Sequence, residues 1–215
     1  LRKKIYLLFS IPLLSGLLWI NVALYFSQAV PLTSMSPDHE LIERLNFIER
    51  ELKDHDLGAK MQNTFPEGQV FVNVMYGLSW CEVARKCDKS DELYSRALKE
   101  ARDAYSEIEK QDSKNIFPMY LEPEYGIFYQ GWSNYLLSNI LDVQDTSTIT
   151  QKELSTSKYK CNIIAQAFIN ASSPFLETYS DQAWPADASI AIASLSLVPN
   201  VQKIGRAHVW TPVTL

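Results

Sequence analysis

PEYGIFYQGWSNYLL, residues 123–137, is a turn containing proline and an acid, followed by an almost uncharged apolar run. Similar turns precede two other apolar runs, at 66–68 (Pro-Glu-Gly) and at 184–187 (Trp-Pro-Ala-Asp). Gly68 and Gly126 are 58 residues apart, and Gly126 and Asp187 are 61 apart. A spacing near 60 residues is typical of a helical hairpin, so the three turns predict three repeated hairpins.

Two kinds of predicted helix alternate along the chain. The segments 67–87, 126–141 and 187–198 are apolar around nearly their whole circumference, which is typical of helices buried on all sides. The segments 90–111 and 150–171 carry charges on one face and apolar residues on the other, and therefore belong to an outer layer.

This alternation predicts an all-α fold, an incomplete α/α toroid of about three hairpins, in which inner helices line a bowl and outer helices surround them. A simple array of antiparallel helices is the structural alternative. A further amphipathic helix is expected before the hairpins, starting at Ser36-Pro37 and ending near Gly58.

The N-terminal segment predicts a membrane anchor. Arg2, Lys3 and Lys4 precede an apolar run over residues 5–26, about the length that crosses a lipid bilayer as one helix. The basic cluster places the following residues outside the cytoplasm. A cleaved signal peptide is the alternative, with Ser27 and Ala29 before the cut. We therefore expect an anchor at 1–30 and an extracytoplasmic domain at 31–203, at a bacterial inner membrane.

Composition argues against several classes of function. With a net charge of −5 and no basic stripe, a nucleic-acid partner is not expected. Glycine-rich phosphate-binding motifs are absent from the sequence. Three cysteines without CxxC spacing and three scattered histidines indicate no zinc site, so we expect neither metal nor cofactor. Whether Cys81 and Cys87 pair is left open by their spacing.

Three acids are candidate catalytic residues. In a toroid the inner helices begin at one end of the bowl, so Glu67, Glu124 and Asp187 are expected around a common opening. Two carboxylates there can act as general acid and base. Asp187 is the first choice for a perturbed pKa, because no other charge lies between Gln182 and Gln202. The structural alternative is ordinary helix-start chemistry, worth about 0.3–1 kcal/mol for each acid.

Aromatic residues near these turns predict a binding surface. Aromatic walls with a few polar groups line pockets for sugars and small apolar ligands. Aromatic residues at helical spacing are more often part of a core, and that alternative stays open. The candidate ligand-binding residues are Tyr125, Tyr129, Trp132, Asn134, Tyr179 and Trp184.

The segments 65–68, 125–134 and 174–187 resemble those of uncharacterised bacterial membrane-anchored proteins. They are more distantly similar to the α/α toroid of linalool dehydratase/isomerase, over about Phe65 to Leu197. The resemblance implies a bowl-shaped pocket at these positions. That enzyme has a histidine where this chain has Trp132 and a catalytic cysteine where it has Asp187, so its reaction does not carry over.

Two classes of function follow as expectations. The first is a lyase or hydrolase acting on a small alcohol or a saccharide, with the carboxylates as acid and base and the aromatic residues as walls. The second is a non-catalytic binding or scaffold protein of the cell envelope. Residues 204–215 resemble a translated sequencing adapter, and we expect them to belong to no fold.

Overall fold

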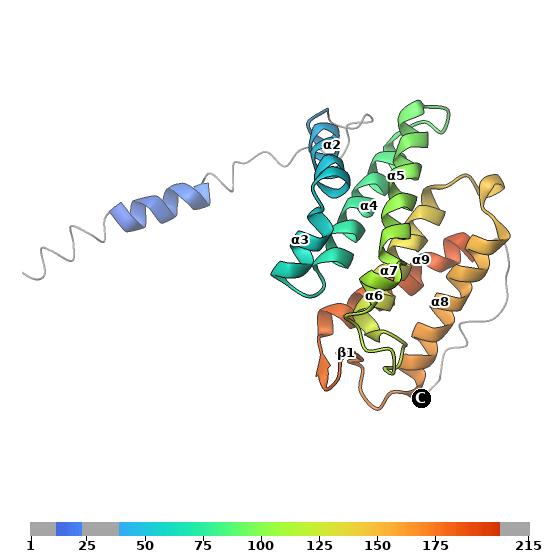
Figure 1. The fold of residues 1–215 in the computed structure, drawn as a ribbon. Coiled ribbons are helices and arrows are strands. Elements are labelled where there is room, and N and C mark those ends of the chain that lie inside the picture. Colours follow the sequence, from blue (N-terminus) through green and yellow to red (C-terminus); the bar gives the residue numbers. More distant parts are fainter. Residues whose placement is uncertain (1–11, 23–38, 203–215) are drawn as a thin grey trace, which may run out of the picture. The chain divides into compact units, whose positions relative to one another are not determined.

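The computed structural model describes residues 12–22 and 39–202, with side chains through residue 197 (Figure 1). The chain divides into two units, Leu1–Met35 and Ser36–Leu215. Residues 12–22 of the first unit form a helix. Within the part of the chain that is described, no helix combines the length and apolar character needed to cross a bilayer. The predicted basic cluster, cleavage site and adapter-like tail lie outside the described residues.

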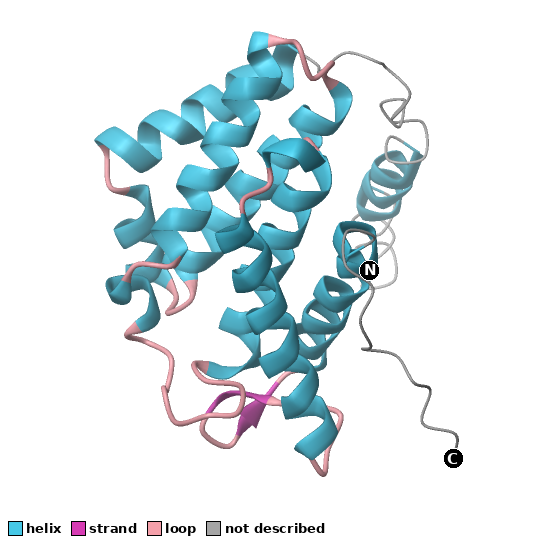
Figure 2. Ribbon diagram, turned by 90° about the vertical axis from the view of Figure 1, so that its right-hand side faces the viewer, coloured by secondary structure: helices cyan, strands magenta, loops and turns pink. Residues whose placement is uncertain are grey.

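The second unit is almost entirely helical, which confirms the all-α prediction. A two-stranded antiparallel hairpin interrupts the helices before the last of them (Figure 2). In chain order the elements are α2 His39–Asp54, α3 Leu57–Thr64, α4 Gly68–Lys86, α5 Glu92–Ile108, α6 Gln111–Lys114, α7 Gly126–Val143, η1 Thr146–Thr148, α8 Gln151–Asn170, β1 Glu177–Tyr179, β2 Gln182–Ala183 and α9 Pro185–Gln202.

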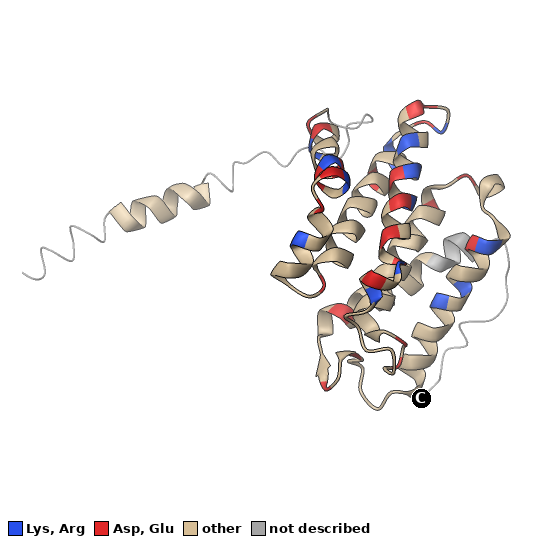
Figure 3. Ribbon diagram, in the orientation of Figure 1, with Lys and Arg blue, Asp and Glu red and all other residues tan. Residues whose placement is uncertain are grey.

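The helices pack in two layers that follow their amphipathicity. The three apolar helices lie in one row, with α7 in contact with both α4 and α9. The striped helices cover this row, α5 against α4 and α7, and α8 against α7 and α9. Lys, Arg, Asp and Glu are concentrated accordingly on α2, α5 and α8 (Figure 3). The alternation seen in the sequence thus becomes a buried row and a charged outer row.

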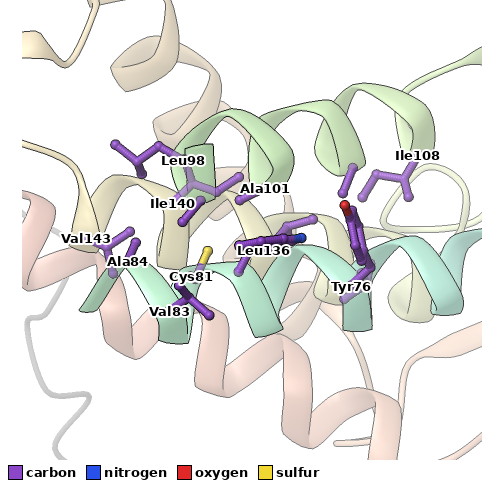
Figure 4. Packing of buried hydrophobic residues seen from close by; sticks show 14 of the residues in the cluster. Tyr76, Cys81, Val83, Ala84, Leu98, Ala101, Ile108, Leu136, Ile140 and Val143 are labelled. Carbon is purple, nitrogen blue, oxygen red and sulfur yellow. The ribbon is translucent and has the colours of Figure 1, made fainter. Parts of the chain in front are cut away.

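The main core lies where α4, α5 and α7 meet (Figure 4). Trp80 of α4, Ile108 of α5 and Leu136 of α7 are fully enclosed there. Burying a side chain of this size contributes about 1.5–3 kcal/mol, so this junction dominates the stability of the described domain. Cys81 and Cys87 are free thiols, and Cys81 belongs to the same core.

The helix expected to end near Gly58 is instead two helices. Asp56 has a left-handed backbone with φ 59°, which breaks the helix between α2 and α3. Gly58 lies inside α3 and is buried beside the flexible side chain of Gln69 in α4. The prediction of one helix ending near Gly58 was therefore wrong, because the chain breaks at Asp56 and continues as α3.

A capping box starts α8 and gives a test of the helix boundary. The hydroxyl of Thr150 accepts from the backbone N–H of Glu153 at 3.2 Å, while the Glu153 carboxylate accepts from the backbone N–H of Thr150 at 2.8 Å. We expect Thr150→Ala to lower the free energy of unfolding in urea by about 1 kcal/mol. As a control, Thr146→Ala removes an exposed hydroxyl with no hydrogen bond in the described part of the chain, and an equal loss there would contradict the prediction.

Candidate functional site

Two of the three predicted acids meet at strand β1. Glu67 directly precedes α4, and Asp187 lies in the first turn of α9. The hydroxyl of Tyr179 donates to Oε1 of Glu67 at 2.9 Å, and the hydroxyl of Thr178 donates to Oδ2 of Asp187 at 2.6 Å. Consecutive residues of one short strand therefore hold carboxylates from the starts of two apolar helices. We call this group of four residues the Glu67–Asp187 site.

The hairpin reaches this position because α7 begins with a glycine. Gly126 has φ +75°, and a Cβ on it would lie 2.5 Å from the backbone oxygen of Thr178. Only glycine lets β1 approach the start of α7 this closely. The ring of Phe117 stacks on Tyr179 with centroids 5.9 Å apart and planes 12° apart, which fixes the Tyr179 ring.

The site also has an exposed aromatic surface. Trp184 packs edge-to-face against Tyr179, with ring centroids 6.3 Å apart. The Trp184 side chain remains 43% exposed, although it lies between β2 and α9 close to Asp187. A large aromatic ring that is held by a neighbour and open to solvent is suited to stacking against a ligand.

The carboxyl group of Asp187 is electrostatically perturbed. Burial raises its pKa, the hydrogen bond from Thr178 opposes this, and the negative charge of Glu67 raises the pKa further. The net direction is upward from the ordinary value. Burial and the neighbouring Glu67 also raise the pKa of Tyr179, so its hydroxyl stays protonated and acts as a donor. Asp187 is thus biased toward the protonated form beside a second carboxyl group.

Glu124 is not part of this arrangement. Its side chain is exposed, and within the described residues its carboxylate takes part in no hydrogen bond or ion pair. Its backbone oxygen accepts from the side-chain amide of Gln130 at 2.7 Å. The turn at 123–125 contains a cis peptide bond before Pro123 and a positive φ at Tyr125, so it differs from the turns that position Glu67 and Asp187.

Of the aromatic residues predicted to line a pocket, some lie at the surface and others in the core. Tyr179 and Trp184 lie at the site. Tyr125 and Trp132 are half-buried against the main core, and Trp132 packs edge-to-face with Phe71. Tyr129, 1% exposed, is a core residue.

Asn134 is fully buried and joins three helices. Its side-chain amide donates to the hydroxyl of Ser194 in α9 at 2.9 Å and to the sulfur of Cys161 in α8 at 3.4 Å. These contacts make Asn134 a structural link of α7 rather than a lining residue of the Glu67–Asp187 site.

A buried ionic cluster around Glu109 was missed by the sequence reasoning. The ammonium of Lys160 lies 2.9 Å from Oε1 of Glu109, and that of Lys114 lies 3.0 Å from Oε2. Hydroxyls of Tyr129 and Ser133 donate to the same carboxylate at 3.0 and 2.6 Å. The Lys160 side chain is only 7% exposed. Nothing in the sequence marks Lys160, since it stands among the ordinary surface lysines of a striped helix.

No protein-family model, curated protein or solved structure matches this chain. Among the described residues, no group of His, Cys, Asp and Glu side chains is arranged to hold a metal ion.

Proposed function

We propose that the Glu67–Asp187 site is a general acid–base centre of a lyase or hydrolase that acts on a small alcohol or a saccharide. The observation that carries this proposal is that consecutive residues of β1 donate hydrogen bonds to two carboxyl groups, those of Asp187 and Glu67, and the raised pKa of Asp187 agrees with it. A carboxyl group that keeps its proton can donate it to a leaving oxygen, while a neighbouring carboxylate accepts a proton from the attacking or reacting group. Asp187 is the proposed acid and Glu67 the proposed base.

Hydrolysis of a glycoside is the reaction that this arrangement supports best. Asp187 would protonate the oxygen of the leaving group as the bond to the sugar carbon breaks, and Glu67 would take a proton from the attacking water. The open ring of Trp184 provides a flat apolar surface of the kind on which sugar rings stack. Dehydration of an alcohol would use the same two proton transfers, with Glu67 removing a proton from carbon.

The toroid and the membrane tether belong to the same proposal. The two-layer packing of three apolar helices under two striped ones agrees with part of an α/α toroid, in which helix starts share one opening.

In the helix at 12–22 the leucines at 13, 14, 17 and 18 are exposed, which suits a lipid environment. We propose that residues 5–26 tether the domain to the outer side of a bacterial inner membrane.

The test compares two site variants, Asp187→Asn and Glu67→Gln, with the control Glu124→Gln in the full-length chain. Aryl glycosides that release p-nitrophenol, a set of small alcohols and free mono- and disaccharides serve as probes of turnover and of thermal stabilisation. We expect turnover of at least one probe and a loss of kcat/KM of about 100-fold or more in Asp187→Asn and in Glu67→Gln. Glu124→Gln removes an exposed carboxyl group outside the Glu67–Asp187 site and should keep the wild-type rate.

The pH profile gives an independent readout. Because the acid must be protonated, the wild-type rate should fall on the alkaline side of the Asp187 pKa, and Asp187→Asn should lack that limb. Wild-type turnover in Asp187→Asn at unchanged melting temperature would refute the acid role. Thermal stabilisation by a saccharide without turnover of any probe would instead indicate a binding protein, the second class expected from the sequence.

A further inference from the structure

An exposed turn after α6 lies beside the β1–β2 hairpin, which carries the donors of the Glu67–Asp187 site (Figure 1). The two ends of this turn are buried, since Phe117 and Leu121 are core residues. Its tip is open to solvent, because Met119 is exposed and the side chain of Tyr120 is 77% exposed. A turn that is anchored at both ends therefore presents two large apolar side chains to solvent.

The Tyr120 side chain is tied to the hairpin although it is exposed. Its hydroxyl forms a hydrogen bond with the hydroxyl of Ser180, the residue that follows Tyr179. The ring of Phe117 stacks on Tyr179, so the turn and the hairpin are joined at two points. A hydrogen bond between two hydroxyls that water can reach adds little to folding, because each replaces a bond to water. Its effect is to fix an aromatic ring that a ligand can reach.

Tyr120 extends the aromatic surface that is already present at the site. Tyr179 donates to Glu67 and packs edge-to-face against the half-open ring of Trp184. Tyr120 reaches the same hairpin at its turn. We call Tyr120, Tyr179 and Trp184 the aromatic rim. The rim gives the site two solvent-accessible rings, one next to the start of α9 and one at the turn of the hairpin.

The charge of the segments that carry the rim limits what can bind to it. Residues 115–125 and 171–187 contain five acids and no Lys, Arg or His. Such segments repel an acidic lipid surface or a nucleic acid. A neutral ligand with an apolar face and several hydroxyls is not repelled, and its hydroxyls can donate to the carboxylates. Sugar rings have both properties.

The openness of the rim favours a chain over a single small molecule. Small ligands bind in concave pockets that bury most of their surface. Trp184 and Tyr120 are both exposed, so one sugar ring would bury only one face on either of them. A chain that contacts both rings gains the second contact after its translational freedom has already been lost. Linked sugar units should therefore bind more tightly than one unit.

We propose that the Glu67–Asp187 site takes a neutral oligosaccharide, with one sugar unit stacked on Trp184 and a further unit on Tyr120. This inference rests on the proposed function and narrows its substrate from a small alcohol or a saccharide to a saccharide chain. Trp184 and Tyr120 bind the chain, while the proton transfers remain those of Asp187 and Glu67.

The experiment is calorimetric titration of the full-length chain at low temperature, which keeps hydrolysis slow. The probes are linear series of glucose, N-acetylglucosamine, mannose and xylose, each from monosaccharide to tetrasaccharide. In at least one series we expect the affinity of the wild type to rise about tenfold or more from monosaccharide to trisaccharide. Trp184→Ala should weaken the binding of every member of that series.

Substitutions of tyrosine locate the second sugar position. Tyr120→Ala removes a largely exposed side chain, so the fold is kept, and it should abolish most of the gain in affinity with chain length. Tyr120→Phe keeps the ring and should keep more of the gain than Tyr120→Ala does. Tyr159→Ala is the matched control, because Tyr159 is an exposed tyrosine of α8 outside the rim, and it should keep the whole gain.

The outcomes separate this inference from the proposed function. Turnover of p-nitrophenyl monosaccharides, together with equal affinity for monosaccharides and longer chains, would overturn the inference and leave the acid–base function standing. A gain with chain length that Tyr120→Ala removes, without turnover of any aryl glycoside, would support the saccharide-binding rim and refute the acid–base function.

Three results would overturn the inference outright. The first is that none of the four series binds saturably. The second is that Tyr120→Ala and Tyr159→Ala both keep the whole gain in affinity. The third is that Tyr120→Ala leaves sugar binding intact but weakens self-association or binding to phosphatidylserine vesicles, since a second copy of the chain or a lipid surface would then cover the rim.

Discussion

Glu109→Gln is expected to lower the free energy of unfolding by about 3–5 kcal/mol, because it leaves a buried ammonium without its counter-charge. The Lys160 side chain is 7% exposed, and Glu109 is its ion-pair partner in the described part of the chain. The same carboxylate holds Lys114 and accepts hydrogen bonds from Tyr129 and Ser133. The substitution therefore removes the centre of a cluster that joins α5, α6, α7 and α8. Urea unfolding followed by circular dichroism measures the loss.

The dependence of the free energy of unfolding on pH should also change in E109Q, at acidic pH. Burial alone would raise the pKa of Glu109, but Lys160, the Ser133 hydroxyl and Lys114 together lower it to about 2. An unfolded glutamate titrates near 4.3, so the contribution of Glu109 is complete above that pH and is lost as the pH falls toward about 2. We expect the wild type to lose stability over this window, and E109Q to lose less.

Glu107→Gln is the matched control for this prediction. Glu107 lies two residues away and pairs with Lys110, but both side chains of that pair are exposed, so its removal should cost less than about 1 kcal/mol. Adding Lys160→Met to E109Q should recover part of the loss, since no unpaired charge is then buried. If Glu107→Gln and Glu109→Gln lowered the free energy of unfolding equally, the buried ion pairs of Glu109 would stabilise the fold no more than an exposed pair does.

Gly126→Ala is expected to destabilise the chain by about 2–4 kcal/mol, through backbone strain and a steric clash together. The φ of +75° is unfavourable for any residue with a Cβ. That Cβ would also lie 2.5 Å from the backbone oxygen of Thr178 and 3.0 Å from that of Glu177, so β1 would have to move. Thermal and urea unfolding of the variant measure the effect.

Gly131→Ala provides the comparison within the same helix. A Cβ at Gly131 would meet Ala191 of α9 at 3.1 Å, a tight contact, while alanine favours the helix by up to about 1 kcal/mol over glycine. We expect these contributions largely to cancel, leaving a change within about 1 kcal/mol. If Gly126→Ala were as mild as Gly131→Ala, the close approach of β1 to α7 would not be a constraint on the fold.

Periodicity in the sequence predicted the three apolar helices and the two striped ones, because a helix buried on all sides and a helix buried on one face have different residue patterns. The segment 150–171 became α8 with Thr150 as its cap, and the three apolar runs became one packed row. The same reasoning predicted that Glu67, Glu124 and Asp187 lie around one opening, and in the structure Glu67 and Asp187 both accept hydrogen bonds from β1. The sequence did not distinguish Glu124, whose turn has a different backbone conformation.

Contacts between distant segments escaped prediction because they depend on packing rather than on local pattern. Residues 175–183 show no alternation long enough to indicate strands, yet they form the hairpin that donates to both acids. Lys160 was grouped with the charged face of its helix, although it is buried in an ion pair with Glu109 and lies over the ring of Tyr129 in α7. Tyr129 and Asn134 were interpreted as lining residues, but they are core residues of α7.

The donors to the two acids are neighbours in a three-residue strand, Thr178 to Asp187 and Tyr179 to Glu67. The pairing of β1 with β2 is irregular between Glu177 and Tyr179, and the positions of both donors depend on this local irregularity. Inserting or deleting a single codon within 177–179 would thus deprive both acids of their partners in one event. Among descendants of this gene, changes in hairpin length are expected at Ser180 and Asp181, where the chain turns and can absorb them.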